Sequence, residues 1–343
     1  MNRRLLAVLL ATGLAASATA QELKRAELGD LPLGSGEVIE DLQVGYRTFG
    51  ALNAERDNAV VLLTWFGGQS EQLAGLVGSE AMLDPARHFV IVIDALANGV
   101  SSSPSNSIKQ PRMAFPVFGM ADLVAANRRL LEVEFELDHV QALVGVSMGG
   151  MQVFEWILQD PEFAESAIII QGSPRLTPYD LLLWQSTFEA IRRDPVWDGG
   201  NYRQQPARRA LYYIAMLSGQ TPESINRQLS RPQVLALLED QTPVEGFDAN
   251  DHLRQVEAML GHDVTRDFAN DLSRAAGAVR SRVLYVWNAK DHVVRPEPGL
   301  EFAKAMNAEV LELPGNCGHG AYACELPMLR QAVAAFLSPP EAE

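Results

Sequence analysis

Short apolar runs recur along the chain, each about as long as a β-strand. They lie at residues 59–63, 89–93, 140–144, 167–170 and 283–287. A run without polar alternation is typical of a strand covered on both faces, as in a parallel sheet. Residues 44–50 alternate polar and apolar positions and predict an earlier strand, and residues 310–313 predict a last one. We expect folded structure to begin at Glu37.

Helical periodicity appears between these runs. Residues 120–131, 151–158 and 326–336 carry apolar side chains at helical intervals. Strands that alternate with helices predict an α/β fold, with a parallel sheet wrapped on both faces. Residues 174–276 contain helical pieces punctuated by Pro and Gly, and no apolar run of strand type. We therefore expect a helical cap at 174–276 inserted into a core formed by residues 21–173 and 277–338. A frayed polar tail should follow at 339–343.

The N-terminus has the pattern of a secretory signal peptide. Arg3 and Arg4 precede an apolar run at residues 5–14, and Ala-Thr-Ala at 18–20 matches the small-residue cleavage pattern. A retained membrane anchor is the alternative, but the run is shorter than the roughly 20 residues that span a bilayer. A lipid anchor is not suggested either, because the sequence has no cysteine near the cleavage site. We expect residues 1–20 to be removed and the mature chain to start at Gln21, in the periplasm or the medium.

Composition and charge narrow the classes of partner. The chain has 343 residues, of which 47% are hydrophobic and 21% charged, so it can bury a large core. Its formal net charge of -15 argues against nucleic acid or an anionic membrane surface as a partner, because both would repel it. The charge also has a simpler explanation, which is solubility. A small-molecule substrate is the expected partner.

One serine occupies the turn between a predicted strand and a predicted helix. Residues 145–149 read Gly-Val-Ser-Met-Gly, with a further glycine at Gly150. Glycines on both sides of Ser147 allow a sharp turn and close packing of the helix on the strand, as in a G-x-S-x-G nucleophile elbow. A chance match is the alternative, because Gly and Ser are common. The flanking strand and helix favour the elbow.

Two residues further along could activate this serine. A serine hydroxyl needs a base to take its proton and an acidic group to orient that base. Asp291 follows the strand that ends at residue 287, and His319 follows the strand that ends at residue 313. The order Ser, Asp, His, each after a strand, is the order expected for this elbow. Taken singly, Asp291 could be a helix cap and His319 a surface histidine in a turn; together with Ser147 they predict a catalytic triad.

Other histidines fit this role less well. His292 is adjacent to Asp291 and would have difficulty reaching a serine on another strand. His88 and His139 precede strands, at the opposite end of the sheet, so a structural role is expected for both.

A tetrahedral intermediate requires two backbone N–H donors directed at its oxyanion. The first should be the amide of Met148, directly after the nucleophile, and the second should come from the loop at residues 65–68. Phe66 is favoured, with the neighbouring amides as alternatives. The glycines of this loop could also be plain turn residues.

Residues 145–156, Gly-Val-Ser-Met-Gly-Gly-Met-Gln-Val-Phe-Glu-Trp, resemble the elbow of the homoserine O-acetyltransferase family of α/β-hydrolases. Residues 194–202 resemble that family's D-P-x-W-x-G-G-x-Y motif, and the similarity covers most of the chain after the signal peptide. The resemblance implies an α/β-hydrolase fold, a mostly parallel sheet with an inserted helical cap, and triad roles for Ser147, Asp291 and His319. It implies acyl transfer through an acyl-Ser147 intermediate without a bound cofactor. Acetyl-coenzyme A as acyl donor and a homodimer stay open.

The departures from the family concern the acyl acceptor. Family members that use homoserine place an Asp directly after the catalytic His, where this chain has Gly320. Loss of a carboxylate that pairs with the substrate ammonium removes a contact worth about 1.5–3 kcal/mol. An approximate match puts the family's substrate-binding Arg at Arg209, which could equally be a solvated cap residue, and Met216 replaces a family Tyr. We expect water or a small alcohol, rather than homoserine, as the acceptor.

The expected compartment supports the same conclusion. Acyl-coenzyme A is a cytoplasmic thioester, whereas water and esters are available to an exported enzyme. An exported carboxylic ester hydrolase is therefore an alternative to a transferase. A non-catalytic binding protein that retains the fold is an alternative from another class, but the presence of Ser147, Asp291 and His319 argues against it.

Cys317 and Cys324 are the only cysteines and flank His319. In an exported protein an even pair suggests a disulfide that braces the histidine loop, with two buried thiols as the alternative. No set of ligands with metal-binding spacing accompanies them, so neither a metal site nor a catalytic cysteine is expected.

Overall fold

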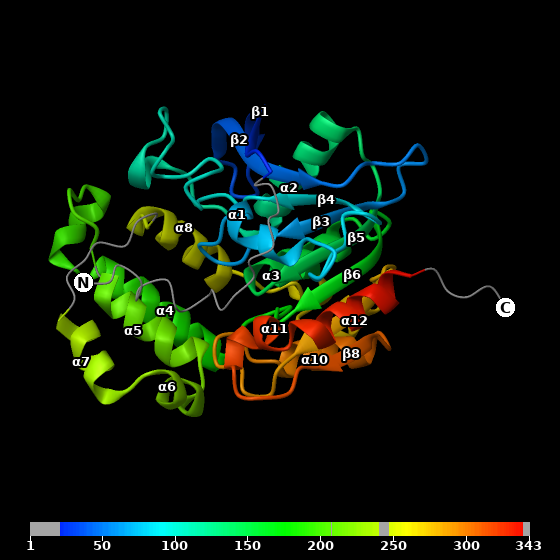
Figure 1. Cartoon of the computed structure of the whole chain (residues 1–343). Coiled ribbons are helices and arrows are strands. Elements are labelled where there is room, and N and C mark those ends of the chain that lie inside the picture. The colour runs from blue at the N-terminus through cyan, green and yellow to red at the C-terminus, as the bar shows by residue number, and fades with distance from the viewer. Residues whose placement is uncertain (1–20, 207, 240–246, 339–343) are drawn as a thin grey trace.

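The computed structural model describes residues 21–206, 208–239 and 247–338 (Figure 1). The predicted signal peptide at 1–20 and the predicted tail at 339–343 lie outside these residues. Among the residues that are described, no helix is long and apolar enough to cross a membrane.

An eight-stranded sheet runs through the molecule in the order β1-β2-β4-β3-β5-β6-β7-β8. The β1 and β2 strands are antiparallel to their neighbours, and the six strands β3 to β8 are parallel to one another. The predicted α/β fold with a mostly parallel sheet is confirmed. The strands are β1 (Lys24–Pro32), β2 (Val38–Phe49), β3 (Ala59–Leu63), β4 (Phe89–Ile93), β5 (Val140–Val146), β6 (Ala164–Ile170), β7 (Arg282–Trp287) and β8 (Glu309–Glu312).

The start of the fold differs from the prediction. Folded structure begins at Lys24 in β1 and not at Glu37, and β2 also starts before the predicted residues 44–50. Only Ala26, Leu28 and Leu31 of β1 are buried, because β1 is an edge strand that pairs with β2 alone. Three apolar residues separated by exposed polar ones form no apolar run, and their pairing register is interrupted twice. Pairing with β2 therefore stabilises β1 more than the pattern of apolar residues in β1 does.

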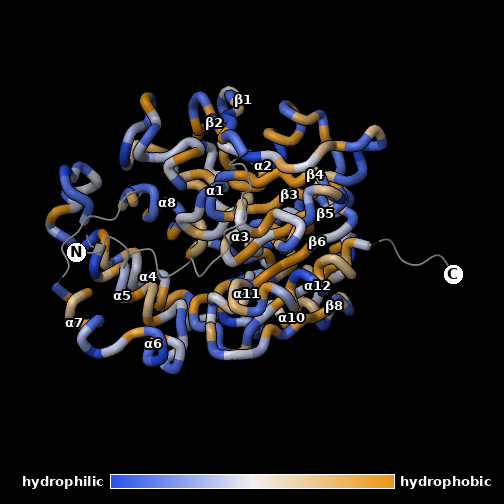
Figure 2. The backbone as a smooth tube through the Cα atoms, in the orientation of Figure 1, coloured by the Kyte–Doolittle hydropathy of each residue, from blue (hydrophilic) through white to orange (hydrophobic). Residues whose placement is uncertain are grey.

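Helices cover both faces of the sheet. Side chains of α2, α3, α9 and α10 join the buried cluster on one face, and those of α1, α11 and α12 join the cluster on the other. Figure 2 shows hydrophobic residues concentrated in the central strands between these layers. The helices are α1 (Ser70–Leu73), α2 (Met120–Phe135), α3 (Met148–Gln159), α4 (Pro178–Arg192), α5 (Arg208–Gly219), α6 (Pro222–Gln228), α7 (Arg231–Glu239), α8 (Ala249–Leu260), α9 (Leu272–Ala276), α10 (Glu297–Ala305), α11 (Ala321–Cys324) and α12 (Leu326–Leu337).

Among the described residues between β6 and β7, the regular elements are helices, and no strand is present. Helices α4 to α7 group together at one end of the molecule, at the left of Figure 1. Helices α8 and α9 pack on the core, because Val256, Met259, Leu272 and Ala275 belong to its main buried cluster, and α4 contributes Trp184 to the same cluster. The division into core and cap at residues 174 and 276 stays a prediction.

The polar loop at residues 98–111 is packed against the sheet. Ser101 and Ser103 within it are fully buried. The Ser101 hydroxyl donates to the carbonyl oxygen of Asp94 at 2.6 Å and accepts from the amide of Gly45 at 2.9 Å. Ser101 thus satisfies a carbonyl directly after β4 and an amide of β2, which explains a polar side chain at this buried position of the loop.

Candidate active site

Ser147 lies between β5 and α3 with a strained backbone. Its φ of 58° and ψ of -118° are unusual for a residue other than glycine. Its amide donates to the carbonyl oxygen of Ile170 at 2.9 Å, which fixes the turn against the end of β6. Strain of this kind is held where the surrounding packing determines it, as in a nucleophile elbow.

The flanking glycines are required by space. A Cβ added to Gly145 would lie 2.1 Å from the carbonyl oxygen of Gly149, and one added to Gly149 would lie 2.3 Å from that of Leu63. Neither neighbour is a flexible side chain that could move away. The start of α3 is therefore pressed directly onto β3 and β5, as the sequence pattern predicts.

The three predicted residues Ser147, Asp291 and His319 meet at the carboxyl edge of the sheet. The Nε2 atom of His319 lies 2.9 Å from the Ser147 hydroxyl oxygen, and its Nδ1 atom lies 2.7 Å from Oδ2 of Asp291. A carboxylate accepts but does not donate, so Nδ1 carries the proton and Nε2 is free to accept from the serine. The arrangement can transfer the serine proton to His319 during nucleophilic attack.

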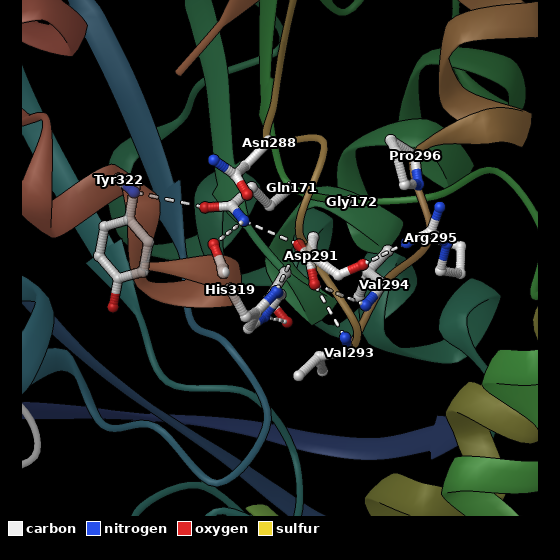
Figure 3. A network of polar contacts seen from close by, with 12 residues as sticks. Gln171, Gly172, Asn288, Asp291, Val293, Val294, Arg295, Pro296, His319 and Tyr322 are labelled. Carbon is white, nitrogen blue, oxygen red and sulfur yellow. Dashed lines mark hydrogen bonds and ion pairs between the residues drawn. The ribbon is translucent and has the colours of Figure 1, made fainter. Parts of the chain in front are cut away.

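Asp291 is buried and held by several donors (Figure 3). Its Oδ1 accepts from the amides of Val293 and Val294 at 2.8 and 3.0 Å. Burial alone would raise the pKa of Asp291, but attraction to His319 and these hydrogen bonds outweigh burial and hold the pKa below its usual value. Asp291 is therefore an anion that can stabilise a protonated His319.

Gln171, which the sequence analysis did not single out, also reaches this site. It follows β6, and its side-chain nitrogen donates to Oδ2 of Asp291 at 2.7 Å. A polar residue directly after a buried strand, at the edge where Ser147 lies, is the signal that could have identified it.

The loop after β3 offers fewer free amides than its sequence suggests. The amide of Gly67 donates to Oε1 of Gln255 at 2.7 Å, and that of Gly68 donates to the Trp65 carbonyl oxygen at 2.9 Å. Among the described residues, the amide of Phe66 donates to no side chain or loop carbonyl. The amide of Met148 is the first in α3, where no earlier turn supplies an acceptor. The oxyanion roles of Phe66 and Met148 stay predictions that these contacts favour.

The three histidines that the sequence placed outside the triad, His88, His139 and His292, have other contacts. The ring of His292 neighbours that of Tyr179, with centroids 6.5 Å apart. His88 and His139 lie directly before β4 and β5, at the opposite edge from Ser147, as expected. His88 contacts the side chain of Gln141 at 2.8 Å.

Arg209 and Met216 both lie on α5. The Arg209 guanidinium donates to the Leu238 carbonyl oxygen of α7 at 3.0 Å, so its substrate-binding role stays a prediction. Met216 lines a cavity of about 170 Å³ between α5, α6 and α7. The other lining residues are aliphatic and aromatic and include Tyr212 and Leu229.

The histidine loop is closed by a disulfide between Cys317 and Cys324. The disulfide alternative is therefore confirmed. Gly320, next to His319, has open space around it, because a Cβ added there would meet no atom within 4 Å. Within the described parts of the chain, no group of three or more His, Cys, Asp or Glu side chains could hold a metal ion.

Comparison with known proteins agrees with this geometry. Residues 59–323 match the sequence model of the alpha/beta hydrolase fold family. The chain belongs to this family. It is 30% identical to an ethyl acetate hydrolase of Pseudomonas veronii over 324 residues, which cover 89% of this chain and 91% of that protein. It is also 30% identical to a homoserine O-acetyltransferase of Caulobacter vibrioides, over 91% of this chain and 93% of that protein.

A solved structure extends the similarity to the fold of nearly the whole chain. The acetylester hydrolase from Corynebacterium glutamicum superimposes with a TM-score of 0.86 at 27% identity, over 92% of this chain and 96% of that one. The resemblance to homoserine O-acetyltransferases is confirmed. Esterases are present among the relatives as well, so membership of the family does not by itself decide between hydrolysis and transfer.

Proposed function

We propose that this α/β-hydrolase is a serine esterase or acyltransferase that acts on small esters through an acyl-Ser147 intermediate. The observation that carries the proposal is the continuous contact from Asp291 through His319 to the Ser147 hydroxyl. His319 takes the serine proton as Ser147 attacks the ester carbonyl, and then gives it to the leaving alcohol. The amides of Met148 and Phe66 stabilise the oxyanion. Water or a second alcohol then releases the acyl group.

Hydrolysis of short acyl esters is the favoured outcome of this chemistry. Gly320 leaves open space beside His319, where a homoserine-using relative is expected to carry a carboxylate. No charge at this position would pair with a substrate ammonium, whereas a neutral ester needs none. The ethyl acetate hydrolase and acetylester hydrolase relatives support acetyl esters. The transferase alternative rests on the homoserine O-acetyltransferase relative, with acetyl-coenzyme A as donor.

The proposed site of action is the periplasm or the medium. The argument is the charged, apolar and small-residue pattern of residues 1–20, with Gln21 as the first mature residue. The net charge of -15 favours small neutral substrates over nucleic acid or anionic membranes. A homodimer is compatible with this proposal but is not required by it.

A fluorophosphonate probe tests the nucleophile. Wild-type protein should be labelled at Ser147 and should hydrolyse p-nitrophenyl acetate. Ser147→Ala should lose the label and about 10³-fold or more in kcat/KM. Ser338→Ala, at the end of α12, is a matched control and should behave as wild type. Labelling that persists in folded Ser147→Ala, or that is absent in folded wild type, would overturn the proposal.

A second experiment separates hydrolysis from transfer. The protein is incubated with acetyl-coenzyme A and L-homoserine and, separately, with ethyl acetate. Acetate release from the ester without O-acetylhomoserine is expected. Robust O-acetylhomoserine formation would show that Gly320 does not prevent homoserine from binding, and would assign the transferase activity instead.

A further inference from the structure

Gln171 occupies a position that favours glycine. It follows the last residue of β6 and has a φ of 49°, in the left-handed region. Its amide donates to the Val286 carbonyl oxygen at 2.7 Å, which continues the pairing of β6 with β7. The next residue, Gly172, is pressed against α3, because an added Cβ would lie 2.8 Å from the Cα of Gly150. A long polar side chain is thus held in a strained turn beside the elbow.

The side-chain amide of Gln171 is buried and forms hydrogen bonds at both its nitrogen and its oxygen (Figure 3). Its nitrogen donates to Oδ2 of Asp291 at 2.7 Å and to the Gly318 carbonyl oxygen at 3.2 Å. Its oxygen accepts from the Tyr322 amide at 3.3 Å. One side chain therefore joins the end of β6 to the loop that carries Asp291 and to both sides of His319.

Only one orientation of this amide is chemically acceptable. The Asp291 carboxylate and the Gly318 carbonyl are both acceptors, so they require the NH₂ end. The Tyr322 amide is a donor, so it requires the oxygen. A rotated amide would place an oxygen against the carboxylate and would lose all three of these hydrogen bonds.

We infer that Gln171 is a positioning residue for catalysis, which holds the Asp291 carboxylate and the histidine loop in register with Ser147. The Oδ2 atom receives two donors, the Nδ1 proton of His319 and the Gln171 amide. The amide keeps Oδ2 directed at His319, while Gly318 and Tyr322 fix the backbone on either side of that histidine. Gln171 itself has no contact with the Ser147 hydroxyl. The inference rests on the proposed esterase function.

Gln171→Met tests the polar contacts with little change in volume. Methionine fills similar space but neither donates nor accepts as the amide does. A lost hydrogen bond to a charged group predicts that kcat falls about ten- to a hundredfold. KM should stay within about twofold of wild type, because Gln171 acts through Asp291 and His319 and not on the substrate.

Gln171→Glu provides a readout that simple packing would not move. In its neutral form the introduced carboxyl can donate its O–H to Asp291 and accept from Tyr322, so it replaces two of the three contacts. In its ionised form it would instead place a second negative charge beside Oδ2 of Asp291, and this repulsion raises the pKa of the introduced group. The ratio of kcat in Gln171→Glu to kcat in wild type should therefore fall as pH rises from about 6 to about 9.

Gln141 supplies a matched control, because it lies at the amino end of β5, opposite to the end that carries Ser147. Its side chain contacts His88 at 2.8 Å and the Leu337 carbonyl oxygen at 3.5 Å. Gln141→Met and Gln141→Glu should keep the kcat and the pH profile of wild type. Each variant is checked for folding by circular dichroism.

The outcomes separate the two proposals. A ratio for Gln171→Glu that does not change with pH would overturn the positioning role, and so would a folded Gln171→Met with wild-type kcat. The kcat ratio of Gln171→Glu, which should be higher at low pH, is measured on a separate variant. The test therefore stays decisive even if Gln171→Met misfolds. Failure of the proposed function would appear differently, as wild-type protein that neither hydrolyses p-nitrophenyl acetate nor reacts with the fluorophosphonate.

Discussion

The buried carboxyl of Asp251 should make stability depend on pH. Asp251 lies on α8 and is 4% exposed, and its Oδ1 accepts from the amide of Ser105 at 2.9 Å. It thus joins α8 to the loop at residues 98–111. Burial, followed by the charge of neighbouring Asp248, raises the pKa of Asp251 from 3.8 to about 7.

The sign of the effect follows from proton binding. Between pH 4 and pH 7 the folded protein keeps a proton on Asp251 that the unfolded chain has lost, so stability falls as pH rises through this window. A shift from 3.8 to about 7 corresponds to about 4 kcal/mol in total. About 2–3 kcal/mol of this loss falls between pH 5 and pH 8. The asparagine in Asp251→Asn cannot ionise, so this variant should not lose stability in this way as pH rises.

Urea unfolding at pH 5, 6, 7 and 8 measures this prediction. The free energy of unfolding of Asp251→Asn minus that of wild type should increase by about 2–3 kcal/mol from pH 5 to pH 8. Titrations of groups that do not interact with Asp251 occur in both proteins and cancel in the difference. Asp138→Asn removes a charge at an exposed position and serves as control. A difference for Asp251→Asn that stays constant within about 0.5 kcal/mol would refute the reasoning.

Three further predictions concern the elbow, the disulfide and a buried histidine. Gly149→Ala places a Cβ 2.3 Å from a β3 carbonyl oxygen, so it should lower the free energy of unfolding by about 1–3 kcal/mol and abolish most fluorophosphonate labelling of the elbow serine. Gly219→Ala, where the added Cβ meets open space, should lower the free energy of unfolding far less. Equal effects of the two substitutions would contradict this prediction. Replacing Cys317 and Cys324 by Ala should lower the free energy of unfolding by about 2–3 kcal/mol, measured against oxidised wild type, and unchanged stability would exclude it. Burial lowers the pKa of His262 from 6.5 to about 4. As pH falls from 6.5 to 4, the unfolded chain binds a proton at this histidine before the folded protein does, so the stability of the fold should decrease. His262→Gln should make the melting temperature depend less on pH over this range.

The local pattern of the chain determined the elbow and the strand ends that serve it. Residues 145–149 specify a turn that only glycines permit, and this requirement is readable because it depends on the nearest neighbours in sequence. Buried parallel strands are apolar throughout, so β3, β4, β5 and β7 were predictable as runs. Asp291 and His319 follow such strands, and the carboxyl ends of parallel strands share one edge. Their proximity to Ser147 could therefore be expected before any distance was known.

Other features depend on contacts between segments far apart in the chain. The β1 strand has too few apolar residues to be recognised, because an edge strand is stabilised by its partner. The pair Cys317 and Cys324 left a disulfide and two thiols equally open until the distance between the two sulfur atoms was known. In the loop after β3, contacts with α8 removed the Gly67 amide from the candidate donors, which the loop sequence does not show.

Gln171 is the clearest case of a residue whose partners only the tertiary structure reveals. Its position directly after β6 indicates the edge of the sheet on which it lies, but not the groups that it contacts. Its partners Asp291, Gly318 and Tyr322 lie more than a hundred residues away. The sequence determined which chemical groups the edge of the sheet would carry, because strand ends and glycine turns are local. The tertiary structure decided which of those groups touch, because the direction of a side chain depends on the packing of all the elements around it.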